Sequence, residues 1–131
     1  NYYDKATRQP GVPGENLLRM LESRLDNVLV RLGFAASRRQ ARQLIRHGHW
    51  WVNGRRVDIP SYQVRPDDVI TIKSGSAAEP IVREATDLTT GVPAWLQADY
   101  DALTAKVLRK PERSEISAPI NEQLIVELYS K

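Results

Sequence analysis

The chain has 131 residues, of which 41% are hydrophobic and none is cysteine, and its formal net charge at pH 7 is +3. This length and apolar content suffice for one ordinary domain or two small ones. The lack of cysteine excludes disulfides, a thiol nucleophile and a Cys-based metal site. No run approaches the roughly 18 consecutive apolar residues of a membrane helix, so we expect no membrane association.

Positive charge is concentrated in the first half of the chain. Residues 1–73 carry thirteen Lys and Arg against seven Asp and Glu, whereas residues 74–131 carry six against nine. Within the first half, the stretch SRRQARQLIRHGHWWVNGRR (residues 37–56) holds six arginines, two histidines and two adjacent tryptophans but no carboxylate. Such a distribution suggests an anionic partner for the first half.

The first predicted elements are a turn-rich N-terminal segment and a helical region. Residues 1–14 contain two prolines and two glycines, which favour turns over a helix interior. From about residue 15 to residue 32, leucine and valine recur at spacings of three and four. This pattern predicts an amphipathic helix, or two helices separated by a short break, that ends at Gly33.

A second helix is predicted at residues 38–47. Ser37 and Gln40 have the spacing of a capping box, and Gly48 stands where a C-terminal cap belongs. At about 100° per residue, the arginines of this segment fall on one side and its apolar residues on the other. The arginine side consists of Arg38, Arg39, Arg42 and Arg46, and the apolar side of Ala41, Leu44 and Ile45.

A hairpin and a further strand should follow this helix. The dipeptide Asn53-Gly54 lies between short strand-like runs, and Asn-Gly is the strongest short signal for a hairpin turn. After a Pro-Asp turn, residues 69–73 alternate between apolar and polar side chains, which predicts a strand. If the hairpin packs beside the helix, Arg55 and Arg56 can converge with the arginines of the helix.

The second half of the chain carries weaker signals. SGSAAEP reads as a linker, a short helix is expected around residues 79–88, and TTGVPAW reads as a turn region. KVLRK has some strand character, and residues 121–129 have the cap and spacing of a C-terminal helix. The sequence therefore predicts an α+β fold.

The arginine side of the second helix has two interpretations. A charged helix face is usually a solvated surface, but such faces normally pair Arg with a carboxylate four residues away, and none is present here. Arginine is also the preferred partner of phosphate. We therefore interpret this side as a nucleic-acid-binding face.

Other candidate chemistry is less well supported. His47 and His49 lack a nearby carboxylate or cysteine, so a structural or RNA-facing role is favoured over a metal site. Of Trp50 and Trp51, one should face the core and the other remain available to a partner. The letters RLD (residues 24–26) also carry the catalytic aspartate of pseudouridine synthases, but here they lie in a helical pattern, which favours a structural role. No catalytic constellation is apparent, and we expect neither an enzyme nor a cofactor.

At this point the sequence resembles a known family. The runs RLDNVLVRLGFAASRRQARQLIRHGHWWVNGRRVDIPSY and VRPDDVITIK look like the RNA-binding module named after ribosomal protein S-four of the small subunit. The module alone also occurs in pseudouridine synthases and tyrosyl-tRNA synthetases. The flanking runs GENLLRMLESRLDN, PAWL and LRKPERSEISAPINEQLIVELYSK resemble the bacterial ribosomal family itself.

The resemblance implies a small helix-plus-twisted-sheet RNA-binding module inserted into a helical domain. Residues 1–21 would belong to the helical domain, residues 22–88 would form the module, and residues 89–131 would include a helix that packs back on the helical domain. Family members are longer at the N-terminus, where many contribute basic RNA contacts, and this chain is expected to lack that region. Trp50-Trp51 also replaces a pair that is usually aliphatic.

The resemblance also implies partners and a set of RNA-facing residues. The partners are small-subunit ribosomal RNA, the neighbouring ribosomal protein S-five and, in some bacteria, a messenger RNA. The implied location is the ribosome in the cytoplasm, with roles in assembly of the subunit body and in translational accuracy. The implied RNA-facing residues are Ser37, Arg38, Arg39, Arg42, Gln43, Arg46, His47, His49, Asn53, Gly54, Arg55, Arg56 and, with a weaker match, Lys73.

Two alternatives remain open. The chain can be the RNA-binding domain of an RNA-modifying enzyme such as a pseudouridine synthase, which predicts a catalytic domain further along the chain. It can also be a protein-interaction module that uses the acidic second half, but this leaves the carboxylate-free arginine side unexplained.

Overall fold

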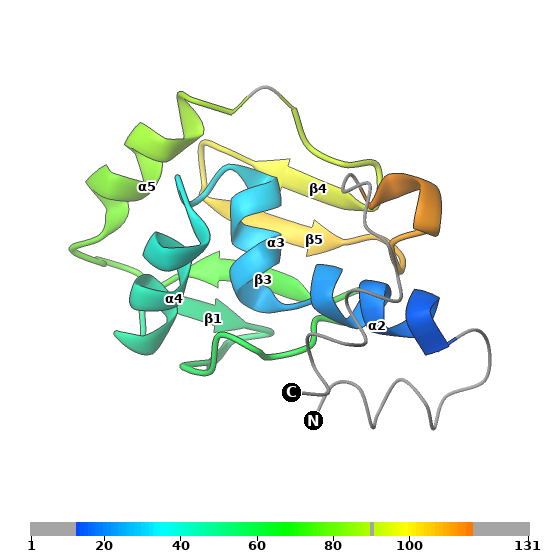
Figure 1. The fold of residues 1–131 in the computed structure, drawn as a ribbon. Coiled ribbons are helices and arrows are strands. Elements are labelled where there is room, and N and C mark those ends of the chain that lie inside the picture. Colours follow the sequence, from blue (N-terminus) through cyan, green and yellow to red (C-terminus); the bar gives the residue numbers. More distant parts are fainter. Residues whose placement is uncertain (1–12, 90, 117–131) are drawn as a thin grey trace.

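The computed structural model describes residues 13–89 and 91–116, and this part of the chain has the α+β fold that the sequence predicts (Figure 1). Its helices are α2 (Pro13–Glu22), α3 (Leu25–Leu32), α4 (Arg38–Arg46) and α5 (Glu79–Thr86). Its strands are β1 (Trp50–Val52), β2 (Arg55–Arg56), β3 (Val69–Ile72), β4 (Leu96–Asp99) and β5 (Thr104–Val107), followed by a 3-10 turn, η1 (Arg113–Glu115). The C-terminal helix predicted at residues 121–129 lies outside the described residues, as does most of the turn-rich segment 1–14.

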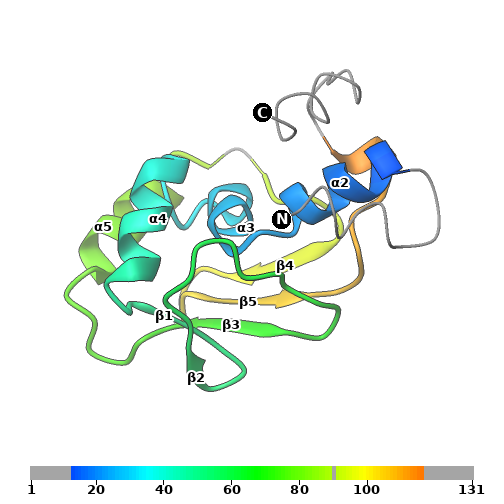
Figure 2. The same ribbon diagram turned by 60° about the horizontal axis from the view of Figure 1, so that its bottom comes forward.

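The strands form one antiparallel sheet in the order β2-β1-β3-β5-β4. Figure 2 shows that α3, α4 and α5 lie on the same side of this sheet. In the described part of the chain, the sheet therefore has one face covered by helices and one open face. Because β5 pairs with β3, the sheet also crosses the boundary expected at residue 88. The division into domains itself stays a prediction.

The helical region predicted at residues 15–32 consists of two helices, α2 and α3, separated by a short break. The break occurs at Arg24, whose backbone is extended and bridges to Gln63. The N-cap residue Arg24 makes no side-chain cap hydrogen bond; instead, the N–H groups of Leu25 and Asp26 donate to carbonyl groups of residues 62 and 60, at 2.8 and 3.2 Å. Gly33 ends α3 with φ 80°, as predicted. A distant loop therefore caps α3, which periodicity alone cannot reveal.

Aromatic packing joins the end of α3, the sheet and the loop after β4. Trp50 is fully buried and stacks on Phe34 with ring centroids 5.2 Å apart, while Tyr100 meets Phe34 edge-on at 5.8 Å. The Tyr100 hydroxyl donates to the carbonyl of Leu32 at 2.8 Å. Trp51 is half-buried and faces the other side of the sheet, so Trp50 is the core residue of the pair.

Strand β4 was not expected from the sequence, which reads as a turn region up to Trp95. Its residues alternate, with Leu96 buried and Gln97 exposed, and it pairs with β5 along its whole length. The alternation covers only four residues, and the strand depends on pairing with a neighbour rather than on local signals.

Candidate nucleic-acid interface

The N-terminus of α4 is capped by the residues that the sequence predicts, with one difference. The hydroxyl of Ser37 accepts a hydrogen bond from the N–H of Gln40 at 3.1 Å. The Gln40 side chain, however, accepts from the N–H of Ala36 at 2.8 Å rather than from Ser37. At the other end, Gly48 follows the helix with φ 78°. Local sequence therefore fixes both the start and the end of α4.

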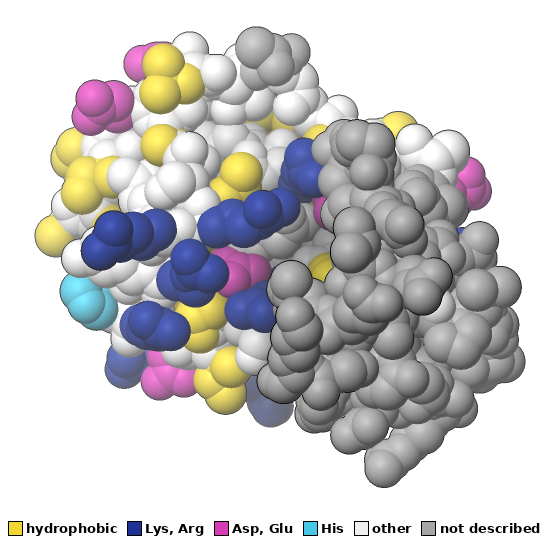
Figure 3. Space-filling view, viewed as in Figure 1, with side chains coloured by type: hydrophobic (Ala, Val, Ile, Leu, Met, Phe, Trp, Pro, Cys, Tyr) yellow, Lys and Arg dark blue, Asp and Glu magenta, His cyan; other side chains and the backbone are white. Residues whose placement is uncertain are grey.

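The two predicted sides of α4 are present. Its apolar residues are at most 6% exposed, namely Ala41, Leu44 and Ile45. Its arginines lie on the outer side, where Arg38, Arg39 and Arg46 are exposed and Arg42 is half-buried. Figure 3 shows Lys and Arg side chains gathered over α4 and α3, with a histidine at the edge of the group.

The arginines of α4 differ in whether the protein itself binds them. Arg38 donates two hydrogen bonds to Oδ1 of Asn27 on α3, at 2.9 and 3.3 Å. Within the described ranges, Arg39, Arg42 and Arg46 have no hydrogen bond or ion pair to a protein group. Together with Gln43 and His47, these three arginines line a shallow hollow of about 360 Å³. Guanidinium groups without partners around one hollow form a site for an anion such as phosphate.

The hairpin brings Arg56, but not Arg55, to the end of α4. Arg56 lies opposite Trp51 and Arg55 opposite Val52, so the two arginines point to opposite faces of the sheet. The Arg56 guanidinium lies against Gly48, where an added Cβ would be only 2.6 Å from Nε. The predicted convergence of helix and hairpin is therefore carried by Arg56 across Gly48.

The tip of the hairpin lies further away. At about 3.3 Å per residue, Asn53 is roughly 16 Å along the chain from Gly48. The Asn53 amide is already engaged, because Nδ2 donates to Asp68 and Oδ1 accepts from the N–H of Val69, each at 2.9 Å. Asn53 and Gly54 have positive φ angles of 52° and 77°, which form the predicted tight turn. The Asn53 side chain thus shapes the turn in this structure, and its contact with RNA stays a prediction.

His49 and Lys73 extend the basic surface past the end of α4. Nδ1 of His49 lies 2.8 Å from the hydroxyl of Ser76, and the backbone N–H of Lys73 donates to the carbonyl of His49 at 2.7 Å. Burial, together with the charges of His47 and Lys73, lowers the pKa of His49 below its ordinary value. His49 is therefore biased toward the neutral form, in which it acts by hydrogen bonding rather than by charge.

The predicted RNA-facing residues all reach the surface, but they do not form one cluster. Arg42 and His49 are half-buried and the other eleven are exposed. The helix residues, His47, His49, Lys73 and Arg56 lie around α4 and its end, whereas the turn at Asn53 lies apart. The sequence did not point to Asn27, because its contact with Arg38 joins two helices eleven residues apart.

Asp26, the aspartate of the RLD motif, has the surroundings of a structural residue. Asp26 is 2% exposed, forms an ion pair with Arg24 at 3.1 Å and accepts a hydrogen bond from the N–H of Asn27. This buried pairing favours the structural interpretation of the motif. The described residues contain no group of three or more His, Asp or Glu side chains that can hold a metal ion, and no described helix is long and apolar enough to cross a membrane.

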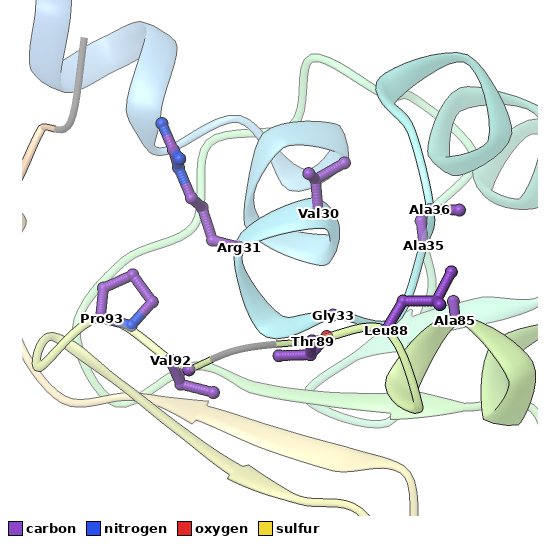
Figure 4. A pocket seen from close by; sticks show the side chains of 11 residues that line it. Val30, Arg31, Gly33, Ala35, Ala36, Ala85, Leu88, Thr89, Val92 and Pro93 are labelled. Atoms are coloured by element: carbon purple, nitrogen blue, oxygen red, sulfur yellow. The ribbon is translucent and has the colours of Figure 1, made fainter.

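A second hollow, of about 440 Å³, lies between the end of α3 and the loop after α5 (Figure 4). Its lining is mostly apolar, including Val30, Leu88 and Pro93, and its one charged lining residue, Arg31, is bound to Glu22 at 2.7 Å. Thr89 packs so closely on Gly33 that any added Cβ would overlap its hydroxyl. This hollow lacks the unpaired cations of a phosphate site, so we assign the candidate interface to α4.

Comparison with known proteins finds a matching domain family and similar ribosomal proteins. Residues 23–70, which contain α3, α4 and the β1–β2 hairpin, match the S4 domain family. The chain is 54% identical to the small ribosomal subunit protein uS4 of Rubrobacter xylanophilus over 129 residues, which are 98% of this chain and 64% of that protein. It is 56% identical to the protein of the same name from Pelotomaculum thermopropionicum, over 99% of this chain and 64% of that protein. It is 53% identical to the protein of the same name from Thermodesulfovibrio yellowstonii, over 100% of this chain and 64% of that protein. The chain thus spans just under two thirds of the length of these relatives, and over that span it is similar to the small ribosomal subunit protein uS4.

Proposed function

We propose that the chain is a structural component of the small ribosomal subunit that binds small-subunit ribosomal RNA through α4 and the adjoining end of the sheet. The observation that carries this proposal is the hollow lined by Arg39, Arg42 and Arg46, three arginines that no described carboxylate neutralises. The names of the relatives support the ribosomal assignment. Its action is binding, without a chemical step or cofactor.

Recognition would combine phosphate contacts with the shape of the folded RNA. The arginines bind phosphate oxygens, and the His side chains reach sugar or base edges. Ribosomal RNA is largely helical, and RNA helices are recognised mainly by shape and by their 2′-hydroxyl and phosphate groups. The surface of α4 therefore needs correctly placed cations more than it needs base-specific groups.

The finer roles rest on the family resemblance. They are nucleation of assembly of the subunit body, contact with the neighbouring protein S-five, an influence on translational accuracy, and binding of a messenger RNA in some bacteria. Each places the chain at the ribosome in the cytoplasm. In this proposal α4 and the adjoining end of the sheet supply RNA affinity, and other parts of the surface meet proteins.

The test is a binding titration with the folded five-prime domain of small-subunit ribosomal RNA over a series of salt concentrations. If about six phosphates are engaged, raising salt from ~50 to ~200 mM should weaken binding roughly 10³-fold by counterion release. The double variant Arg42→Ala/Arg46→Ala should bind more weakly and lower the salt slope by about two.

The matched control is Lys106→Ala/Lys110→Ala, which removes two exposed cations from the other end of the sheet. It should leave affinity and salt slope close to those of the unchanged chain. Equal losses in both doubles would show that net charge, rather than the α4 surface, determines binding, and the proposal would then fail.

A further inference from the structure

The open face of the sheet has two halves of different chemistry. Trp51 on β1 lies directly opposite Arg56 on β2 and Thr71 on β3. At the other end, Asp99 lies on β4, and Lys106 on β5 forms an ion pair with Asp67 at 3.9 Å. The half formed by β1, β2 and β3 therefore carries an aromatic ring and cations, whereas the far half carries a carboxylate on β4 and a paired lysine on β5.

A histidine and a further cation lie next to Trp51 on this side. Because side chains alternate along a strand, His49 shares the face of Trp51, and Lys73 shares that of Thr71. Lys73 is exposed and has no described ion-pair partner, and none of the residues within β1, β2 and β3 is acidic, although the exposed Asp58 follows β2. This half of the face is therefore complementary in charge to an RNA strand.

The exposed part of Trp51 is apolar. The residue is half-buried, yet its indole N–H is inaccessible to solvent and no described group accepts a hydrogen bond from it. At Trp51 the sheet therefore presents carbon atoms of the indole ring to solvent. Trp50 and Trp95 are both fully buried, so Trp51 is the tryptophan that a ligand can reach.

This half of the face is continuous with the α4 surface. The Arg56 guanidinium, which belongs to a residue opposite Trp51, lies against Gly48 just beyond the end of α4. A polynucleotide bound along α4 would meet Arg56 and His49 next, and then Trp51. Its phosphates would stay near cations along this path.

We propose that Trp51 is a stacking platform for an unpaired base of the RNA that α4 binds. The inference rests on the proposed RNA-binding function and adds a second class of contact to it. Stacking on an aromatic ring tolerates any base, because every base has a π-face, and it requires no hydrogen bond from the buried indole N–H. Arg56 and Lys73 would hold the phosphates on either side of the stacked nucleotide.

Two RNA probes test the proposal: a blunt RNA hairpin, and the same hairpin with an extension of unpaired uridines. Stacking should quench tryptophan emission with the extended hairpin and leave it nearly unchanged with the blunt one. Trp51→Leu should weaken binding of the extended hairpin by roughly 5- to 150-fold and leave affinity for the blunt hairpin as it is. Trp51→Phe keeps a ring and should retain most of the affinity, and circular dichroism confirms that both variants fold.

The outcomes separate this inference from the function on which it rests. Salt-dependent binding of both hairpins without quenching, and with equal affinity for Trp51→Leu, would overturn the stacking platform and leave α4 as the RNA surface. Quenching that follows protein concentration in the absence of RNA would show that a second copy covers this face, which also overturns it. Failure of the unchanged chain to bind either hairpin would overturn the proposed function itself.

Discussion

Basic side chains over α3 and α4 gather on one side of the molecule, yet the protein uses them differently (Figure 3). Arg31 on α3 is bound to Glu22, a carboxylate residue that is only 4% exposed. Arg42 and Arg46 on α4 have no partner in the described part of the chain. In the proposed function, the RNA surface is therefore set by where carboxylates lie beneath the basic residues rather than by the number of basic residues.

The largest effect expected from this difference between the two helices is on the free energy of unfolding. Arg31→Met should leave the buried Glu22 carboxylate uncompensated and lower the free energy of unfolding by about 2 kcal/mol, less than for a fully buried pair because Arg31 is partly exposed. Arg42→Met should change it by less than about 0.5 kcal/mol. Urea unfolding measures both.

RNA binding should show the reverse order. Arg42→Met should weaken it, whereas folded Arg31→Met should bind like the unchanged chain. Adding Glu22→Leu to Arg31→Met removes the stranded carboxylate and should restore most of the lost stability. Similar stability losses for Arg31→Met and Arg42→Met would contradict the distinction between Arg31, which is paired with Glu22, and the unpaired Arg42.

Arg56 lies on β2 rather than on α3 or α4. Substitutions at two glycines test whether its position matters for RNA binding. Gly48 and Gly54 have nearly equal φ angles of 78° and 77°, so alanine at either should cost about 1 kcal/mol of backbone strain. Only at Gly48 would the new Cβ meet Arg56; nothing lies within 4 Å at Gly54. Because a guanidinium can swing away, Gly48→Ala should cost little extra stability but lower RNA affinity and salt slope as Arg56→Ala does. Equal RNA binding by Gly48→Ala and Gly54→Ala would show that the place of Arg56 does not matter.

Arg38 is the arginine of α4 that the protein also uses for itself. Asn27 is 3% exposed and its Oδ1 accepts from Arg38, so Arg38→Ala should leave a buried acceptor unsatisfied and cost about 1 kcal/mol. Arg39→Ala, its neighbour without a protein partner, is the matched control and should cost less than about 0.5 kcal/mol. Thermal unfolding of both distinguishes them, and equal costs would mean that the bond to Asn27 contributes nothing.

Much of the fold and of the interface could be predicted from the sequence because its signals are local. Ser37, Gly48 and Asn53-Gly54 fix the ends of α4 and the turn through their own backbone and side-chain preferences. The features that could not be predicted depend on distant partners: the carbonyls that cap α3, the pairing of β4 with β5, and the bond between Asn27 and Arg38. The separation of Arg55 from Arg56 follows from strand alternation once β2 is known to pair with β1.

The smallest expected effect is a dependence of stability on pH at His49, which lies between α4 and β1. Its pKa is lowered in the folded protein by burial and by His47 and Lys73, so the unfolded chain binds more protons than the folded one near and below the ordinary pKa. The neutral ring therefore contributes stability above that pKa, and this contribution should fade as pH falls through the folded value. His49→Asn should flatten the fall in the urea midpoint between pH 7.5 and pH 5.5. RNA should oppose this fall, because phosphates near His49 favour the protonated ring. If bound RNA leaves the pH dependence unchanged, His49 does not face the phosphates, and the basic surface ends with α4.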